Sequence, residues 1–242
     1  KGNVLSEMNR VREAIDAFDA ALRIDPKYEG AWINRAITMQ GDEQYERSIR
    51  SLDTLLRLNP QHVLALRRKA LAYRMCGRGA EAGPLYEEAL RLRPGDADIW
   101  TSRGEMFSEL AQAEKALSCY DKAIALRPER RLPRINRARQ LVVAGRSAEG
   151  VKAFSELATA FAGEPAALNE IAIGMCAVNL QDRAIPLFEE SLRLRPSEAA
   201  VFLCNIGNAL LEMNREMEAV GWYERSIKAN PKYVSAYIQS AK

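Results

Sequence analysis

The sequence has little of what catalytic and metal sites need, with one histidine and four cysteines among 242 residues. His62 follows Pro60 in an expected loop, and nothing there indicates a histidine paired with a nucleophile. The cysteines lie far apart with no C-x-x-C pair, which argues against a zinc site. No G-x-x-x-x-G-K-[ST] phosphate loop occurs either. We therefore expect no catalytic residue, no metal and no cofactor, and a protein that is not an enzyme.

Long apolar runs and a strong charge of one sign are also missing. No stretch approaches the length of a membrane span, and no signal peptide is visible. The sequence has no Asn-x-Ser/Thr glycosylation site, and its isolated cysteines are typical of a reducing compartment. A net charge of +3 gives no indication of a nucleic-acid or membrane partner. These features favour a cytoplasmic protein that binds neither nucleic acid nor a membrane.

The chain does contain a proline at a regular interval. Pro26, Pro60, Pro94 and Pro128 are each 34 residues apart, and Pro196 lies 68 residues, or two intervals, beyond Pro128. A fixed period of this size indicates a stacked array of equal repeats, none of which can bury its apolar face alone.

Two further columns of residues follow the same period. A small residue stands four positions before a large apolar one, in the pairs Ala14–Phe18, Ala82–Tyr86, Ala116–Tyr120 and Ala184–Phe188. Another small residue recurs where two helices would approach closely, at Gly2, Ala36, Ala70, Gly104, Ala138, Ala172 and Gly207. These columns resemble the tetratricopeptide repeat, a helix–turn–helix unit with Trp, Gly, Tyr, Ala, Phe and Pro at fixed positions. The resemblance implies an all-α, right-handed superhelix of such repeats.

The resemblance covers the whole chain as one elongated solenoid domain, residues 1–242. With the closing proline as position 32, the repeats are 1–28, 29–62, 63–96, 97–130, 131–164, 165–199 and 200–233, followed by a partial helix over 234–242. The first repeat predicts a helix over 11–24, ended by Asp25–Pro26 because proline cannot continue it. Pro84 and Pro186 are expected in the first turn of their helices, where a missing amide costs no helix hydrogen bond.

The resemblance also implies that the first helices of successive repeats line a concave groove. Residues at its groove positions are the candidate peptide-binding residues: Asn3, Asn34, Arg67, Arg68, Arg74, Asp98, Glu105, Glu109, Asn136, Arg139, Asn169, Asn205 and Asn208. We expect the groove to hold an extended segment or helix of a partner protein. Its acidic groups would lie opposite the third and fifth repeats and its basic groups opposite the fourth. The predicted function is a non-catalytic scaffold for protein–protein interaction.

One pattern within the family, the carboxylate clamp of members that bind chaperone tails, is matched in part. Asn3, Asn34 and Arg68 occupy three of its five positions, while Leu64 stands where a lysine is expected. Arg67 and Arg68 could still hold a carboxylate with paired N–H donors.

A second pattern is the asparagine ladder of the O-linked N-acetylglucosamine transferase, which holds the backbone of an extended peptide. Asn34, Asn136 and Asn205 match it. The ladder is interrupted by Arg68, Ser102 and Glu170. The match to this pattern is therefore also partial.

Several alternatives stay open at this point. The three groove-position arginines of the third repeat could instead pair with the three groove-position carboxylates of the fourth, each exposed pair adding about 0–1 kcal/mol. The chain could be a regulatory or substrate-recruiting module of a larger enzyme, for example a glycosyltransferase. Self-association through the ends is a further alternative, and the arginine run over 127–139 raises RNA binding, although stacking aromatics are lacking. The sequence begins inside a repeat, so a targeting segment before Lys1 stays open too.

Overall fold

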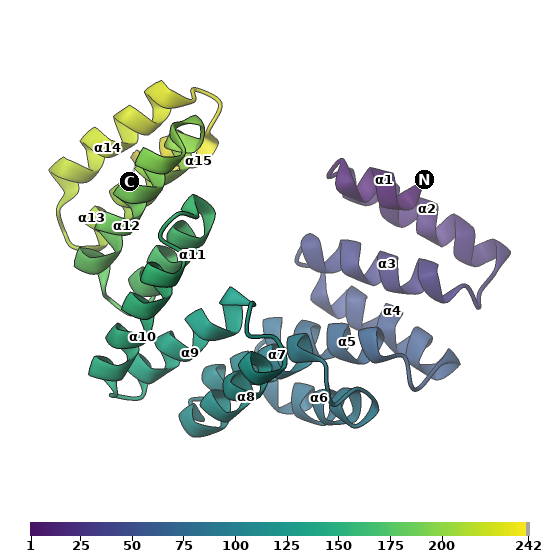
Figure 1. Cartoon of the computed structure of the whole chain (residues 1–242). Helices are drawn as coiled ribbons and strands as arrows, with labels where there is room; N and C mark the ends of the chain where they lie inside the picture. Colours follow the sequence, from purple (N-terminus) through teal and green to yellow (C-terminus); the bar gives the residue numbers. More distant parts are fainter. Residues whose placement is uncertain (241–242) are drawn as a thin grey trace. The chain divides into compact units, whose positions relative to one another are not determined.

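The computed structural model describes residues 1–240, and its elements are helices joined by short turns (Figure 1). By contacts the chain divides into two compact units, Lys1–Pro128 and Glu129–Lys242, here called the N-terminal and C-terminal units. The N-terminal unit contains α1 (Gly2–Glu7), α2 (Val11–Ile24), α3 (Glu29–Gly41), α4 (Tyr45–Leu58), α5 (Val63–Met75), α6 (Gly79–Leu92), α7 (Ala97–Glu109) and α8 (Ala113–Leu126).

The C-terminal unit contains α9 (Arg131–Val143), α10 (Ser147–Ala160), α11 (Pro165–Cys176), α12 (Gln181–Leu194), the short 3-10 helix η1 (Pro196–Glu198), α13 (Ala199–Glu212), α14 (Glu216–Ala229) and α15 (Val234–Ser240). The helical repeats predicted from the sequence are thus confirmed, and α2 has the predicted bounds. The expectation of a single domain stays a prediction.

Within each unit the helices pair as hairpins, and the hairpins stack. Every odd-numbered helix from α1 to α13 packs against the next even-numbered one, and those with a preceding even-numbered helix in their unit pack against that one as well. Successive first helices touch as well, α3 with α5, α5 with α7, α9 with α11 and α11 with α13. We call these odd-numbered helices the first-helix layer of their unit. Their direct contacts bring side chains from adjacent repeats together.

Each hairpin turn contains one residue in the left-handed backbone conformation. These residues recur at the repeat spacing, and they are Asn9, Glu43, Gly77, Ala111, Gly145, Asn179 and Asn214. The following N–H donates to the carbonyl five residues earlier, as from Arg78 to Tyr73 at 2.8 Å. This hydrogen bond closes a Schellman-type helix end and satisfies a carbonyl that the helix would leave unpaired. The turn therefore has the same geometry in all seven hairpins.

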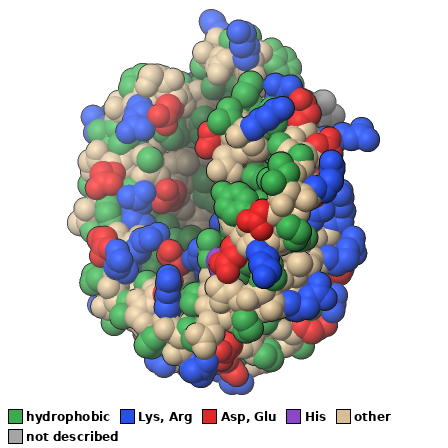
Figure 2. Space-filling view, turned by 90° about the vertical axis from the view of Figure 1, so that its right-hand side faces the viewer, with side chains coloured by type: hydrophobic (Ala, Val, Ile, Leu, Met, Phe, Trp, Pro, Cys, Tyr) green, Lys and Arg blue, Asp and Glu red, His purple; other side chains and the backbone are tan. Residues whose placement is uncertain are grey.

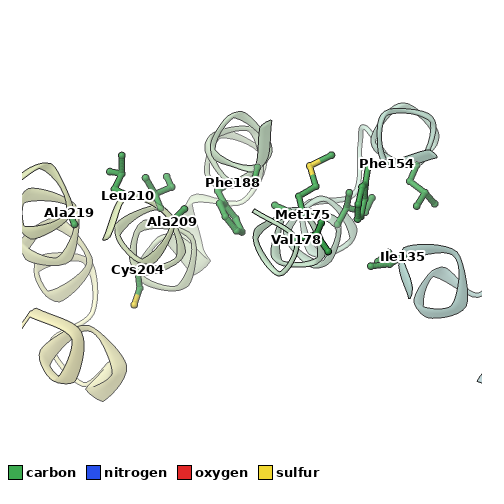
Figure 3. Packing of buried hydrophobic residues seen from close by; sticks show 14 of the residues in the cluster. Ile135, Phe154, Met175, Val178, Phe188, Cys204, Ala209, Leu210 and Ala219 are labelled. Carbon is green, nitrogen blue, oxygen red and sulfur yellow. The ribbon is translucent and has the colours of Figure 1, made fainter. Parts of the chain in front are cut away.

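The core of each hairpin is built from the small and large residues of the predicted columns. Phe154 and Phe188, both almost fully buried, project from α10 and α12 between neighbouring helices (Figure 3). A Cβ built on Gly104 would lie 2.5 Å from Cε1 of Tyr120, and one on Gly207 equally close to Tyr223. The absent side chain is what allows each aromatic ring to lie against the first helix.

Adjacent repeats are also joined by tryptophan hydrogen bonds at the closing prolines. Nε1 of Trp32 donates to the carbonyl of Pro26, and Nε1 of Trp100 donates to the carbonyl of Pro94, each at 2.9 Å. Each bond ties the linker after one repeat to the first helix of the next. The spacing of the tryptophans in the sequence did not reveal these hydrogen bonds.

The prediction for Pro84 and Pro186 is wrong. Because α6 begins at Gly79 and α12 at Gln181, each proline is the sixth residue of its helix and lies beyond the first turn. Each helix therefore lacks one backbone hydrogen bond, which the sequence analysis assumed it would keep. Pro165, in contrast, lies at the start of α11.

Replacing Gly104 by alanine tests the close packing of the hairpin. We expect Gly104→Ala to destabilise the fold by about 1–3 kcal/mol, because the new methyl group must displace the Tyr120 ring. Gly221→Ala is the matched control, since a Cβ there meets no atom within 4 Å. That change should stabilise α14 by about 0.5–1 kcal/mol. Urea unfolding followed by circular dichroism measures both, and equal effects would contradict the packing described.

Candidate functional site

Arg74 lies at the centre of an ion-pair network in the first-helix layer of the N-terminal unit. Its Nη1 is 2.7 Å from Oε2 of Glu105, and its Nε is 3.0 Å from Oε2 of Glu109. Nη1 also donates to the carbonyl of Ser102 at 3.2 Å. The Arg74 side chain is only 9% exposed, so this guanidinium is occupied by the neighbouring helix α7. These three charged residues hold adjacent repeats together.

The pKa values of this network reflect its burial. Burial alone would lower the pKa of Arg74, but Glu105, Tyr86 and Glu109 outweigh that effect and raise it. The pKa of the Glu109 carboxyl is raised, because burial and the charge of Glu105 exceed the effect of Arg74. The hydroxyl of fully buried Tyr86 faces the same charges, and burial raises its pKa.

Arg67 and Arg68 differ from Arg74 in how they are paired. Arg67 has one long ion pair, with 3.5 Å from its Nη1 to Oδ2 of Asp98. Arg68 makes no ion pair among residues 1–240, and its buried Nε has no hydrogen-bond partner. Burial, followed by the positive charge of Arg67, lowers the pKa of Arg68. A partly buried guanidinium without a counter-ion is a favourable place for an anionic group to bind.

The remaining candidates of the N-terminal unit are asparagines. Asn3 lies on α1 and Asn34 on α3, and neither side chain is hydrogen-bonded within the described part of the chain. Asn34 is partly buried and Asn3 is exposed. Their amides are thus available for a ligand.

The first-helix layer of the C-terminal unit contains several asparagine amides beside the arginines of α9. Nδ2 of Asn205 donates to Oδ1 of Asn169 at 2.8 Å, which links α13 to α11. The hydroxyl of Tyr223 donates to Oδ1 of Asn208 at 2.9 Å. Nη1 of Arg139 is 3.5 Å from Oδ1 of Asn136, on the same helix α9. The structure therefore brings Asn169 and Asn205 together.

The arginine run of the fourth and fifth repeats is partly neutralised. Arg131 donates to Glu170 at 2.9 and 3.3 Å and to Glu164 at 3.4 Å. The guanidinium of Arg134 lies over the ring of Phe161, 5.9 Å from its centroid. Acidic and basic side chains are likewise interspersed on the face of the molecule shown in Figure 2.

A hollow at the junction of α11 and α13 was missed by the sequence analysis. It has a volume of about 300 Å³, and its lining residues are Ile173, Cys176, Ala177, Phe188, Asn205, Asn208, Ala209 and Glu212. Ile173 is 49% exposed, because its side chain lies on the surface of the first-helix layer and not in the core. An isoleucine in a helical repeat is usually expected to be a core residue. The sequence could have indicated this site only through the groove position of Ile173.

His62 has a structural role that the sequence analysis did not predict. Nδ1 of His62 accepts a hydrogen bond from the N–H of Ala65 at 3.1 Å and so caps α5. Asp96, one repeat later, caps α7 in the same way through Asp98 and Ile99. Residues 1–240 contain no group of three His, Cys, Asp or Glu side chains arranged to hold a metal ion.

Comparison with known families gives the assignment. Models of the tetratricopeptide repeat match residues 1–28, 40–97, 97–130 and 200–233, which together are more than half of the chain. The chain belongs to the tetratricopeptide repeat family. The resemblance of its residue columns to this repeat is confirmed, and so is the all-α solenoid fold class. Within the described residues, no helix is both long and apolar enough to cross a membrane.

Several curated proteins contain a similar region. Anaphase-promoting complex subunit 3 of Schizosaccharomyces pombe is 26% identical over 58% of this chain and 21% of its own length. The human protein O-mannosyl-transferase TMTC1 is 25% identical over 73% of this chain and 20% of its own length. The peroxisomal targeting signal receptor of Saccharomyces cerevisiae is 23% identical over 94% of this chain and 33% of its own length. The chain thus spans between a fifth and a third of these relatives.

Solved structures show the same architecture. The crystal structure of yeast Tom70 superposes with a TM-score of 0.72 at 20% identity, over 96% of this chain and 50% of that one. At this level of identity the likeness shows the fold alone.

Substitution of Arg74 measures how much the ion-pair network stabilises the repeat junction. We expect Arg74→Ala to lower the free energy of unfolding by about 2–3 kcal/mol, because the buried guanidinium is lost and both partly buried Glu105 and exposed Glu109 lose their partner. Arg91→Ala is the control, since Arg91 and Glu88 form an exposed pair within α6. Its urea midpoint should equal that of the wild type. A midpoint for Arg74→Ala that also stays unchanged would show that the network contributes nothing to stability.

Proposed function

We propose that this chain is a non-catalytic protein-binding module that holds an extended segment of a partner against its first-helix layer. The observation that carries the proposal is Arg68, a partly buried guanidinium that has no counter-ion among residues 1–240. Its neighbours in the layer, Arg67 and Arg74, do have acidic partners. The partner segment would supply the missing anion as an aspartate, a glutamate or a terminal carboxylate.

A carboxylate fits Arg68 for geometric and energetic reasons. The planar guanidinium offers parallel N–H donors that match the two oxygens of a carboxylate. Burial of Arg68 already disfavours its charge, so an anion there gains from a lower local dielectric constant than water has. Arg67 is held only loosely, at 3.5 Å from Asp98, and can turn toward the same ligand.

The ion pairs narrow the expected charge pattern of the partner. Arg74 pairs with both Glu105 and Glu109 and leaves the three residues with one net negative charge instead of two, which weakens the case for basic partner groups opposite the fourth repeat. Asn3 and Asn34, whose amides are unpaired, would instead bind the backbone of the segment beside Arg68. We therefore propose that an acidic group of the partner fixes its register at the third repeat.

The relatives support a binding role in general terms. The matched yeast protein is named as a receptor for a peroxisomal targeting signal, and another relative is named as a subunit of a complex. A second candidate function is a recruiting module of a larger enzyme, which the match to a protein O-mannosyl-transferase favours. In both cases the repeats themselves would bind protein.

Selection from a random dodecapeptide display library tests the proposal directly. Peptides enriched on the wild type should carry an acidic residue or a free terminal carboxylate. Their affinity should fall about 10- to 100-fold on the double variant Arg67→Gln/Arg68→Gln, which loses the charge-assisted hydrogen bonds. Isothermal titration calorimetry measures this, with a melting scan to confirm that the variant is folded.

Arg91→Gln serves as the matched control, because Arg91 is an exposed arginine on the second helix α6 of the same repeat. Its affinity for the selected peptides should equal that of the wild type. Peptides without acidic groups, or equal binding by the double variant, would contradict the assignment of Arg68. Failure of any peptide to be enriched would contradict the proposed function itself.

A further inference from the structure

We infer that the hollow between α11 and α13 is a second binding site, a pocket for one aliphatic side chain of an extended peptide segment. The inference rests on the proposed function, because it assumes that the first-helix layer holds such a segment. It adds a different specificity, since the ligand group is apolar and the site belongs to the C-terminal unit, whereas Arg68 belongs to the N-terminal unit.

The size and lining of the pocket select a single side chain. Its volume of about 300 Å³ is at the lower limit of pockets that hold small molecules, so it is too small for a large cofactor. Ile173 and Ala177 line it beside the thiol of Cys176, Ala209 lines it from α13, and buried Phe188 lines it from α12. A leucine, isoleucine or methionine side chain would cover the exposed half of Ile173 and remove apolar surface from water.

The amides beside the pocket match the backbone of an extended segment. Because Nδ2 of Asn205 is used by Asn169, the Oδ1 of Asn205 and the Nδ2 of Asn169 have no partner in the described residues. One is an acceptor and the other a donor, as needed for the N–H and C=O of a peptide unit. Asn208 is fixed by the hydroxyl of Tyr223, which leaves its Nδ2 as a further donor. The pocket thus has apolar walls beside oriented polar groups.

The charge of the pocket excludes an acidic ligand. Glu212 lines it and accepts a hydrogen bond from Nε2 of Gln181 at 2.8 Å, so this carboxylate is held in place. A second carboxylate inserted beside it would be repelled at close range. Burial, followed by Glu212, raises the pKa of Cys176 to about 11, so the thiol stays neutral and acts as an apolar wall. The site therefore prefers an aliphatic residue to an acidic one.

The pocket can be filled without disturbing the core. Ala177 lies at the C-terminal end of α11, where it is exposed and has helical backbone angles. Ala177→Phe would therefore occupy the pocket from its open side. Ile173→Ser removes the apolar wall and leaves the volume open. Val220→Ser is the control, because Val220 is similarly exposed but lies on the second helix α14.

Dodecapeptides selected on the full chain provide the probes. Peptides that bind the C-terminal unit should contain Leu, Ile or Met, and their affinity should fall tenfold or more on Ala177→Phe. Ile173→Ser should weaken the same peptides, replacement of their aliphatic residue by aspartate should abolish binding, and Val220→Ser should have no effect. Titration calorimetry gives the affinities, and melting scans confirm folding.

Three outcomes would overturn the inference. If the selected peptides bind Ala177→Phe as tightly as the wild type but lose affinity on Arg67→Gln/Arg68→Gln, the pocket is no binding site while the proposed function stands. If the aspartate replacement binds equally well, the aliphatic specificity is wrong. If no peptide is enriched at all, the inference fails together with the proposed function.

Discussion

The structure depends on the close approach of the two helices in each hairpin. At Gly104 and Gly207 the first helix has no side chain toward its partner, and a tyrosine ring fills the space that a methyl group would need. Neither helix could bury its apolar face alone, and hydrophobic burial between neighbours supplies the stability of a repeat array. Because this contact uses one face of each first helix, a different face of that helix remains for charged and polar side chains.

What those free faces contain differs between the two compact units. In the N-terminal unit, arginines and carboxylates of adjacent repeats largely pair with one another, as Arg74 does with Glu105. Arg68 is the exception that points to an anionic ligand. In the C-terminal unit, the amides of Asn169 and Asn205 lie beside the hollow at Ile173. The same helical framework thus carries two chemically different surfaces, in agreement with the rule that repeat proteins differ mainly in their exposed positions.

Residue columns in the sequence predicted the repeats, because prolines and small–large pairs recur at a fixed interval. Pro84 was misplaced even though the predicted start of α2 at Val11, advanced by two periods of 34 residues, is the observed start of α6 at Gly79. The left-handed residue of one turn, Ala111, carries no sequence signal at all. Pairing of Arg74 was foreseen as an alternative, whereas the hollow at Ile173 was not, since its lining comes from three helices whose contact the sequence does not specify.

Photo-crosslinking tests the central claim most directly, namely that the first-helix layer is the surface that binds a partner segment. A peptide selected on the full chain would carry a benzophenone side chain, and mass spectrometry would locate its attachment after irradiation. The account predicts attachment to odd-numbered helices, such as α5, α7, α11 and α13. Attachment confined to the outer faces of the second helices, α4, α6, α12 and α14, would contradict it.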